Sequence, residues 1–257
     1  MAMTGPAELL ATWEAGLGQH GQGRALLLHR AARPAAADGE LLSVPLGERE
    51  ADLFALRRTL FGERLQVRID CGRCAEAMEF DLDTDELLAG QPRWEGPLRV
   101  AEGEWVVEFR LPTAADLAAA SPAASGASGA EAEAGPALAR RRLLARCTLS
   151  AERAGKPVAA DGLTALPEPV QRRLAEAVEQ ADPAAEVTLK VACPECGEAT
   201  LAELDIASYL WTELDSWARD QLLDVHLLAT AYGWSEREIL ALSPLRRRYY
   251  LELCADA

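Results

Sequence analysis

Two stretches far apart in the chain alternate apolar and polar residues with the two-residue period of a β-strand, and each leads into a pair of cysteines. The first, residues 65–69, ends at Cys71-Gly-Arg-Cys74, and the second, residues 187–191, ends at Cys193-Pro-Glu-Cys196. A second short alternating run follows each cysteine pair. The pattern therefore predicts two similar β-hairpins, each with a CxxC motif in its turn.

Most of the remaining chain has the apolar spacing of amphipathic helices. The predicted helices cover residues 7–31 with a glycine-rich break, 48–61, 137–149, 169–181, 214–232 and two further short segments. Alternation predicts another β-hairpin from residues 98–100 and 105–111. Residues 118–136 contain only Ala, Ser, Gly, Pro and Glu. That composition offers too little apolar surface to order itself and predicts a flexible loop.

The C-terminal third contains start and stop signals for three consecutive short helices. Gly233 stands where a glycine closes the first helix, Ser235 and Glu238 fit a capping box for the second, and Pro244 fits the first position of the third. Leu245, Tyr249 and Leu253 supply the apolar stripe of the last helix, and Arg246–Arg248 lie across its other faces.

We therefore expect an α+β fold, mostly helical, with a small antiparallel zinc-ribbon-like β element split by a long insertion. The predicted segments are an N-terminal helical segment (1–62), the first half of the ribbon (63–90), the insertion with its hairpin, loop and helices (91–184), the second half of the ribbon (185–204) and a C-terminal three-helix module (205–257).

The cysteine pairs predict a structural zinc site formed by Cys71, Cys74, Cys193 and Cys196, because two CxxC turns complete a four-sulfur tetrahedral shell. A ribbon that keeps reduced thiols and a pair of redox motifs are the alternatives. Redox CxxC motifs lie at helix N-termini, whereas these lie between strand-like runs, which argues against redox chemistry. Cys147 and Cys254 lie on apolar helical patterns and are interpreted as small core residues.

Composition limits location and partners. The sequence contains no run of eighteen apolar residues and no signal-peptide pattern, so we expect a cytoplasmic protein without membrane partners, in which cysteines favour metal over disulfides. Its 41 acidic against 26 basic residues give a formal net charge of −15. Nucleic-acid binding depends on neutralising phosphates with Lys and Arg, so this charge favours protein partners.

No nucleotide-binding glycine motif or Ser/His/Asp arrangement is present, and a four-sulfur metal leaves no open position for water. We therefore expect no enzymatic activity.

Several motifs resemble one protein family. The C-terminal stretches Asp205–Trp211, Ala231–Leu240 and Leu242–Leu251 are similar to the baseplate hub assembly proteins of contractile-tailed phages and phage-tail-like contractile injection systems. The Cys193-Pro-Glu-Cys196-Gly197 turn and the Phe109–Thr113 segment fit the same family.

The resemblance implies a non-enzymatic assembly chaperone or minor structural component of the baseplate, binding hub or spike proteins. Trp234, Arg247 and Tyr250 are the predicted partner-binding residues, because Trp, Tyr and Arg concentrate binding energy at interfaces. Two alternatives stay open at these positions: Trp234 fills the module's own core, or Arg247 pairs with Glu236 or Glu238. The alternative function is a zinc-ribbon regulator that binds nucleic acid.

Overall fold

The computed structural model describes residues 5–84, 87, 96–120, 135–159, 162–163 and 166–255. It contains two compact units. The first, here called the ribbon unit, covers residues 35–205, and the second, the helical unit, combines residues 1–34 with 206–257. The fold is α+β, as predicted: most elements are helices, and the sheets are small and antiparallel. The boundary between units divides the predicted N-terminal segment, because the helices of residues 6–32 pack with the C-terminal helices.

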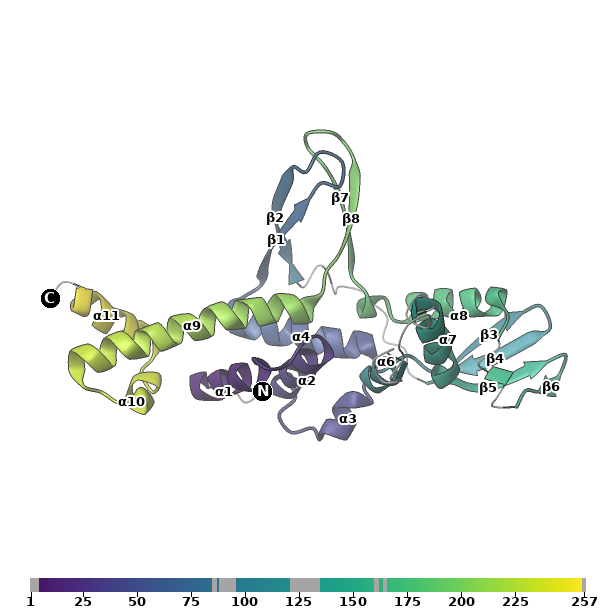
Figure 1. Ribbon diagram of the computed structural model, residues 1–257, viewed down its shortest axis with the longest axis horizontal. Coiled ribbons are helices and arrows are strands. Elements are labelled where there is room, and N and C mark those ends of the chain that lie inside the picture. The colour runs from purple at the N-terminus through teal and green to yellow at the C-terminus, as the bar shows by residue number, and fades with distance from the viewer. Residues whose placement is uncertain are drawn as a thin grey trace. The chain divides into compact units, whose positions relative to one another are not determined.

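Both cysteine hairpins form. β1 (Arg64–Asp70) pairs antiparallel with β2 (Ala77–Asp83), and β7 (Thr188–Ala192) pairs antiparallel with β8 (Ala199–Glu203). The two hairpins lie side by side in the ribbon unit (Figure 1) and share a small apolar core. This core places the two CxxC turns together although more than a hundred residues separate them in sequence.

A four-stranded antiparallel sheet forms the other part of the ribbon unit, in the order β3 (Leu98–Glu102), β4 (Trp105–Phe109), β5 (Thr148–Arg153) and β6 (Lys156–Pro157). Helix α8 (Glu168–Ala181) packs on the sheet, and the apolar core between them includes Val107, Phe109 and Leu174. The hairpin of β3 and β4 confirms the prediction, whereas β5 was not predicted.

The sequence pattern hides β5 because only two of its six residues are buried, Thr148 and Ala151. They are three positions apart, so the strand lacks the apolar alternation by which strands are recognised. The preceding helix also ends earlier than predicted. The prediction placed a helix over 137–149, whereas α7 (Gly135–Cys147) ends two residues before that limit.

The remaining elements of the ribbon unit are α3 (Asp38–Leu42), α4 (Leu46–Phe61), α6 (Ala114–Ala120) and a 3-10 turn, η4 (Pro183–Ala185). The prediction of a loop over residues 118–136 is wrong at both ends, because residues 118–120 belong to α6 and residues 135–136 belong to α7. Residues 121–134 lie outside the described part of the chain. Alanine is a strong helix former, which explains why α6 extends through residues 118–120.

The helical unit contains α1 (Pro6–Gly16), α2 (Gln22–Ala32), α9 (Ile206–Tyr232), α10 (Glu236–Leu240) and α11 (Pro244–Ala255). Three C-terminal helices were predicted, but the first is long: α9 has 27 residues and begins within the Asp205–Trp211 motif. The predicted punctuation is confirmed at α10, where Ser235 and Glu238 form a capping box. Gly233 follows α9 with φ +69°, a backbone conformation that favours glycine.

Close packing and polar contacts hold α1 and α2 on α9. A Cβ atom at Gly16 would lie 2.2 Å from the Trp211 ring, so only glycine permits this approach. The Trp13 indole Nε1–H donates to Asp215 Oδ1 (2.8 Å), and the Arg24 guanidinium lies 4.4 Å from the Trp211 ring centre. Among the helices that the structure describes, none has the length and apolarity to cross a membrane.

Candidate metal centre and contact residues

The two cysteine turns have the same backbone geometry. In the first, the Cys71 N–H donates to Glu76 O (2.8 Å) and the Ala75 N–H donates to Cys71 O (2.9 Å). In the second, the Cys193 N–H donates to Glu198 O (2.8 Å) and the Gly197 N–H donates to Cys193 O (2.9 Å). The residue after each second cysteine has positive φ, +59° at Ala75 and +72° at Gly197. Each turn thereby directs two thiols to the same side.

The four sulfurs form one cluster. Cys71 Sγ lies 3.6 Å from Cys196 Sγ, and Cys74 Sγ lies 3.6 Å from Cys193 Sγ. All four sulfurs lie within 4.8 Å of one another. Four sulfurs bound tetrahedrally to zinc at about 2.3 Å would be about 3.8 Å apart, so the thiols have the spacing that a metal of this size requires. The structure therefore brings together all four predicted ligands, in pairs formed across the hairpins.

The pKa values of Cys71 and Cys74 are shifted in opposite directions. Backbone N–H groups of Cys74 and Arg73 stabilise the Cys71 thiolate and lower the pKa of Cys71 to about 6. At Cys74 a backbone N–H of Glu76 favours the thiolate, but the neighbouring sulfurs and burial outweigh it and raise the pKa of Cys74 to about 12. One thiolate therefore opposes ionisation of the next, because like charges repel at this distance. A bound cation would remove that repulsion and stabilise its ligands as thiolates.

The surroundings of the cluster support the two buried ligands, Cys71 and Cys193. Ile69 and Met78 are buried beside them. The Arg73 guanidinium of the first turn pairs with the Glu198 carboxylate at 3.6 Å, and both side chains are exposed. This ion pair joins one hairpin to the other and was not predicted. Glu195, between the two ligands of the second turn, is exposed.

The two remaining cysteines lie away from the cluster. Cys147 is buried at the end of α7, and burial raises the pKa of its thiol to about 11. Such a thiol stays protonated and packs as a small apolar residue, as predicted. Cys254 is half-buried in α11.

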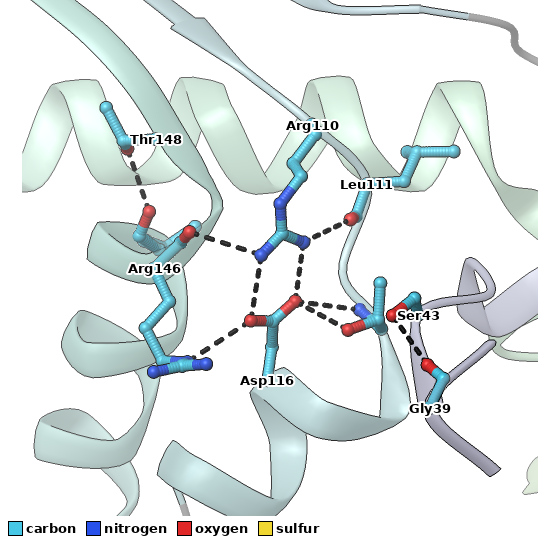
Figure 2. Close-up of polar contacts among 9 residues, drawn as sticks. Gly39, Ser43, Arg110, Leu111, Asp116, Arg146 and Thr148 are labelled. Carbon is cyan, nitrogen blue, oxygen red and sulfur yellow. Dashed lines mark hydrogen bonds and ion pairs between the residues drawn. The ribbon is translucent and has the colours of Figure 1, made fainter. Parts of the chain in front are cut away.

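A second cluster, without cysteines, joins β4, α6 and α7. Asp116 is only 1% exposed and accepts two hydrogen bonds from Arg110, at 2.6 and 2.9 Å, and one from Arg146 at 3.2 Å (Figure 2). The Thr113 N–H and hydroxyl also donate to Asp116, at 3.1 and 2.8 Å. This cluster was not predicted from the sequence. Thr113 immediately precedes α6, and its side chain donates to the Asp116 carboxylate.

The predicted contact residues of the helical unit separate into two sets. Trp234 stacks on Tyr232 with ring centres 4.7 Å apart and meets Tyr250 edge to face at 4.8 Å. Trp234 and Tyr250 are both half-buried, so the pair fills the junction between α9 and α11 and still reaches solvent. Partner binding by these two residues stays a prediction.

Arg247 lies elsewhere. It is 3% exposed, contacts Gln221 and pairs with Asp224 of α9 at 3.7 Å. Its partner is thus neither Glu236 nor Glu238. A guanidinium in this position fastens α11 to α9, and the structure does not place it on a surface with Trp234 and Tyr250.

Comparison with known proteins yields one family. The family model described as T4 bacteriophage base plate protein matches residues 33–211, more than two thirds of the chain. The match includes both cysteine hairpins, the Asp116 cluster and the start of α9. No curated protein and no solved structure matches the chain.

Proposed function

The chain belongs to the T4 bacteriophage base plate protein family, and from this premise we propose that it is a non-enzymatic assembly chaperone or minor component of a baseplate hub. It would act in a contractile phage tail or injection system by binding hub or spike proteins. The family match over residues 33–211 carries this proposal. The net charge of −15 agrees with protein rather than nucleic-acid partners.

The metal in the proposal is a structural zinc ion held by Cys71, Cys74, Cys193 and Cys196. The 3.6 Å sulfur spacings and the four-sulfur donor set support it, since thiolates are soft ligands that select zinc among the divalent ions of the cytoplasm. Zinc would neutralise the mutually repelling thiolates and lock the two hairpins together. With four protein ligands it would have no open position for a substrate, which supports a non-catalytic role.

The test is affinity purification of the full chain from cells that produce the tail, followed by mass spectrometry and metal analysis of the same eluate. We expect hub or spike proteins together with about one zinc per chain. Nucleic acid without tail proteins would instead support the zinc-ribbon regulator. Mass spectrometry of purified mature tails then separates the two forms of the proposal: a structural component is present there, whereas a chaperone is found only in assembly intermediates.

Trp234→Ala tests the predicted contact residue. If Trp234 binds a partner, this variant loses captured hub proteins while Trp234→Phe, which keeps a ring between Tyr232 and Tyr250, loses fewer. Equal capture by Trp234→Ala and wild type would remove Trp234 from the contact surface. Circular dichroism checks that both variants fold.

A further inference from the structure

The outer face of α11 carries a stripe of large apolar side chains in solvent. Leu245, Tyr249 and Leu253 are 61%, 59% and 60% exposed. They are spaced by four residues, and at 100° per residue they fall within an arc of about 80° on one side of the helix. A surface helix ordinarily turns such a stripe toward the core.

The opposite side of α11 explains this orientation. Arg247 lies about 160° from Leu245 and Tyr249 and about 120° from Leu253 around the helix. Among the described side chains of α11 it is the most buried, held by Gln221 and Asp224. Rotating α11 to bury the stripe would expose Tyr250 and break this ion pair. α11 lies beside the second half of α9 (Figure 1). Its contacts with α9 leave the apolar stripe exposed to solvent.

The charged residues beside the stripe indicate what kind of surface would cover it. Arg246 and Arg248 are exposed and lie on either side of Tyr249, and Arg248 also pairs with Glu252 at 3.1 Å. With the exposed Glu252 on the same side, the two arginines leave this face a small excess of positive charge, in a chain whose net charge is −15. Complementary potentials are a common feature of specific interfaces, so a covering surface would carry acidic residues beside apolar ones.

We propose that the outer face of α11, formed by Leu245, Tyr249 and Leu253 with Arg246 and Arg248 beside them, binds an amphipathic helix of another baseplate protein whose apolar stripe is flanked by Asp or Glu. A helix suits the site because residues spaced by four recur on one side of both partners and interdigitate. This inference rests on the proposed assembly role. A second copy of this chain is the less suitable occupant, because it would bring a second net charge of −15 against the first.

The test uses two fluorescent peptides designed as helices, with leucines four residues apart and either Glu or Lys on both flanks. Fluorescence anisotropy with the full chain should show the Glu peptide binding about tenfold more tightly than the Lys peptide, a difference of about 1.4 kcal/mol, because Glu attracts and Lys repels the two arginines. Tyr249→Glu should weaken binding of the Glu peptide at least about tenfold. Leu149→Glu, which changes an exposed leucine of the ribbon unit, is the matched control and should bind as wild type does.

Each of the following outcomes would overturn the inference. Equal affinity for the two peptides would show that charge does not select the occupant. Unchanged binding in Tyr249→Glu would show that the peptide binds elsewhere. Sedimentation that reveals a dimer of the wild type, abolished by Tyr249→Glu, would assign the face to a second copy. Co-expression with hub and spike proteins separates this inference from the proposed function: capture by wild type and Tyr249→Glu alike would reject the α11 site only, whereas no capture by wild type would reject the assembly role.

Discussion

The cysteine cluster and the Asp116 cluster both tie together segments that are separate in the sequence, but they balance charge in opposite ways. Asp116 has its counter-charges within the protein, from Arg110 and Arg146. The cysteine cluster contains four groups that become negative when ionised, and the exposed Arg73 pairs with Glu198 rather than with them. A buried acid that brings its own cations is complete without a ligand, whereas four thiols need an external cation before they can all ionise.

Of the changes considered, removal of the predicted metal ligand Cys193 should affect stability most. Structural zinc contributes on the order of 10 kcal/mol to folding in small zinc domains, so Cys193→Ser should lose the metal and unfold at least the two hairpins. Cys147→Ser is the matched control, because Cys147 is also buried but lies outside the cluster. Metal analysis and thermal melting in reductant test both variants. An unchanged melting curve in Cys193→Ser would reject the structural metal.

Removing the charge of Asp116 should have the next largest effect. Asp116→Asn leaves Arg110 and Arg146 without their shared carboxylate, but both arginines are partly exposed and can be hydrated. We therefore expect a loss of about 2 kcal/mol in the free energy of unfolding, at the low end for a buried pair, with zinc content unchanged. Glu176→Gln, at an exposed pair with Arg173 in the same unit, should cost less than about 1 kcal/mol. Denaturant unfolding of the two variants measures the contrast, and similar losses would show that the Asp116 cluster is energetically ordinary.

The two clusters should also differ in acid. Burial alone would raise the pKa of Asp116, but hydrogen bonds from Arg110 and Thr113 outweigh it and lower that pKa from 3.8 to about 2. A pKa lowered in the folded state gives stabilisation that is present above pH 4 and is lost as the pH falls toward 2. The stability difference between wild type and Asp116→Asn should therefore be constant above pH 4 and shrink below it. A difference that does not depend on pH would contradict the assigned charge.

Metal binding should fail earlier on acidification than the Asp116 cluster, because protons compete with zinc for thiolates. Zinc release followed with a chelating dye, alongside the unfolding measurements, gives the order of the two events. If the stability contributed by Asp116 is lost at a higher pH than the zinc, this prediction is wrong.

The smallest effects on stability are expected from substitutions in the backbone of the two cysteine turns. Ala75 and Gly197 occupy the same left-handed position of the two turns, and open space surrounds Gly197. Gly197→Ala should therefore destabilise the protein by about 1 kcal/mol through backbone strain, and Ala75→Gly should be neutral or stabilising by up to about 1 kcal/mol. Both variants should keep their zinc. A stabilising Gly197→Ala or a destabilising Ala75→Gly would show that the two turns are not equivalent.

What the sequence determined about this protein is local. The two hairpins, their CxxC turns and the helix ends at Gly62, Gly233 and Ser235 follow from short-range rules, because alternation, turn geometry and capping involve residues a few positions apart. The shared ligand set was predictable from the same rules, since a CxxC turn supplies half of a tetrahedral shell and needs another half.

Tertiary structure decided the features that depend on distant partners. β5 is a strand because β4 lies beside it, although its own alternation is weak. Asp116 became the centre of a cluster because the ends of β4 and α7 bring two arginines to it. Arg247 was buried, and the apolar stripe of α11 turned outward, because Asp224 and Gln221 of α9 lie where they bind the guanidinium. A periodic pattern shows which residues share a face of a helix, but only the neighbouring elements determine which face is covered.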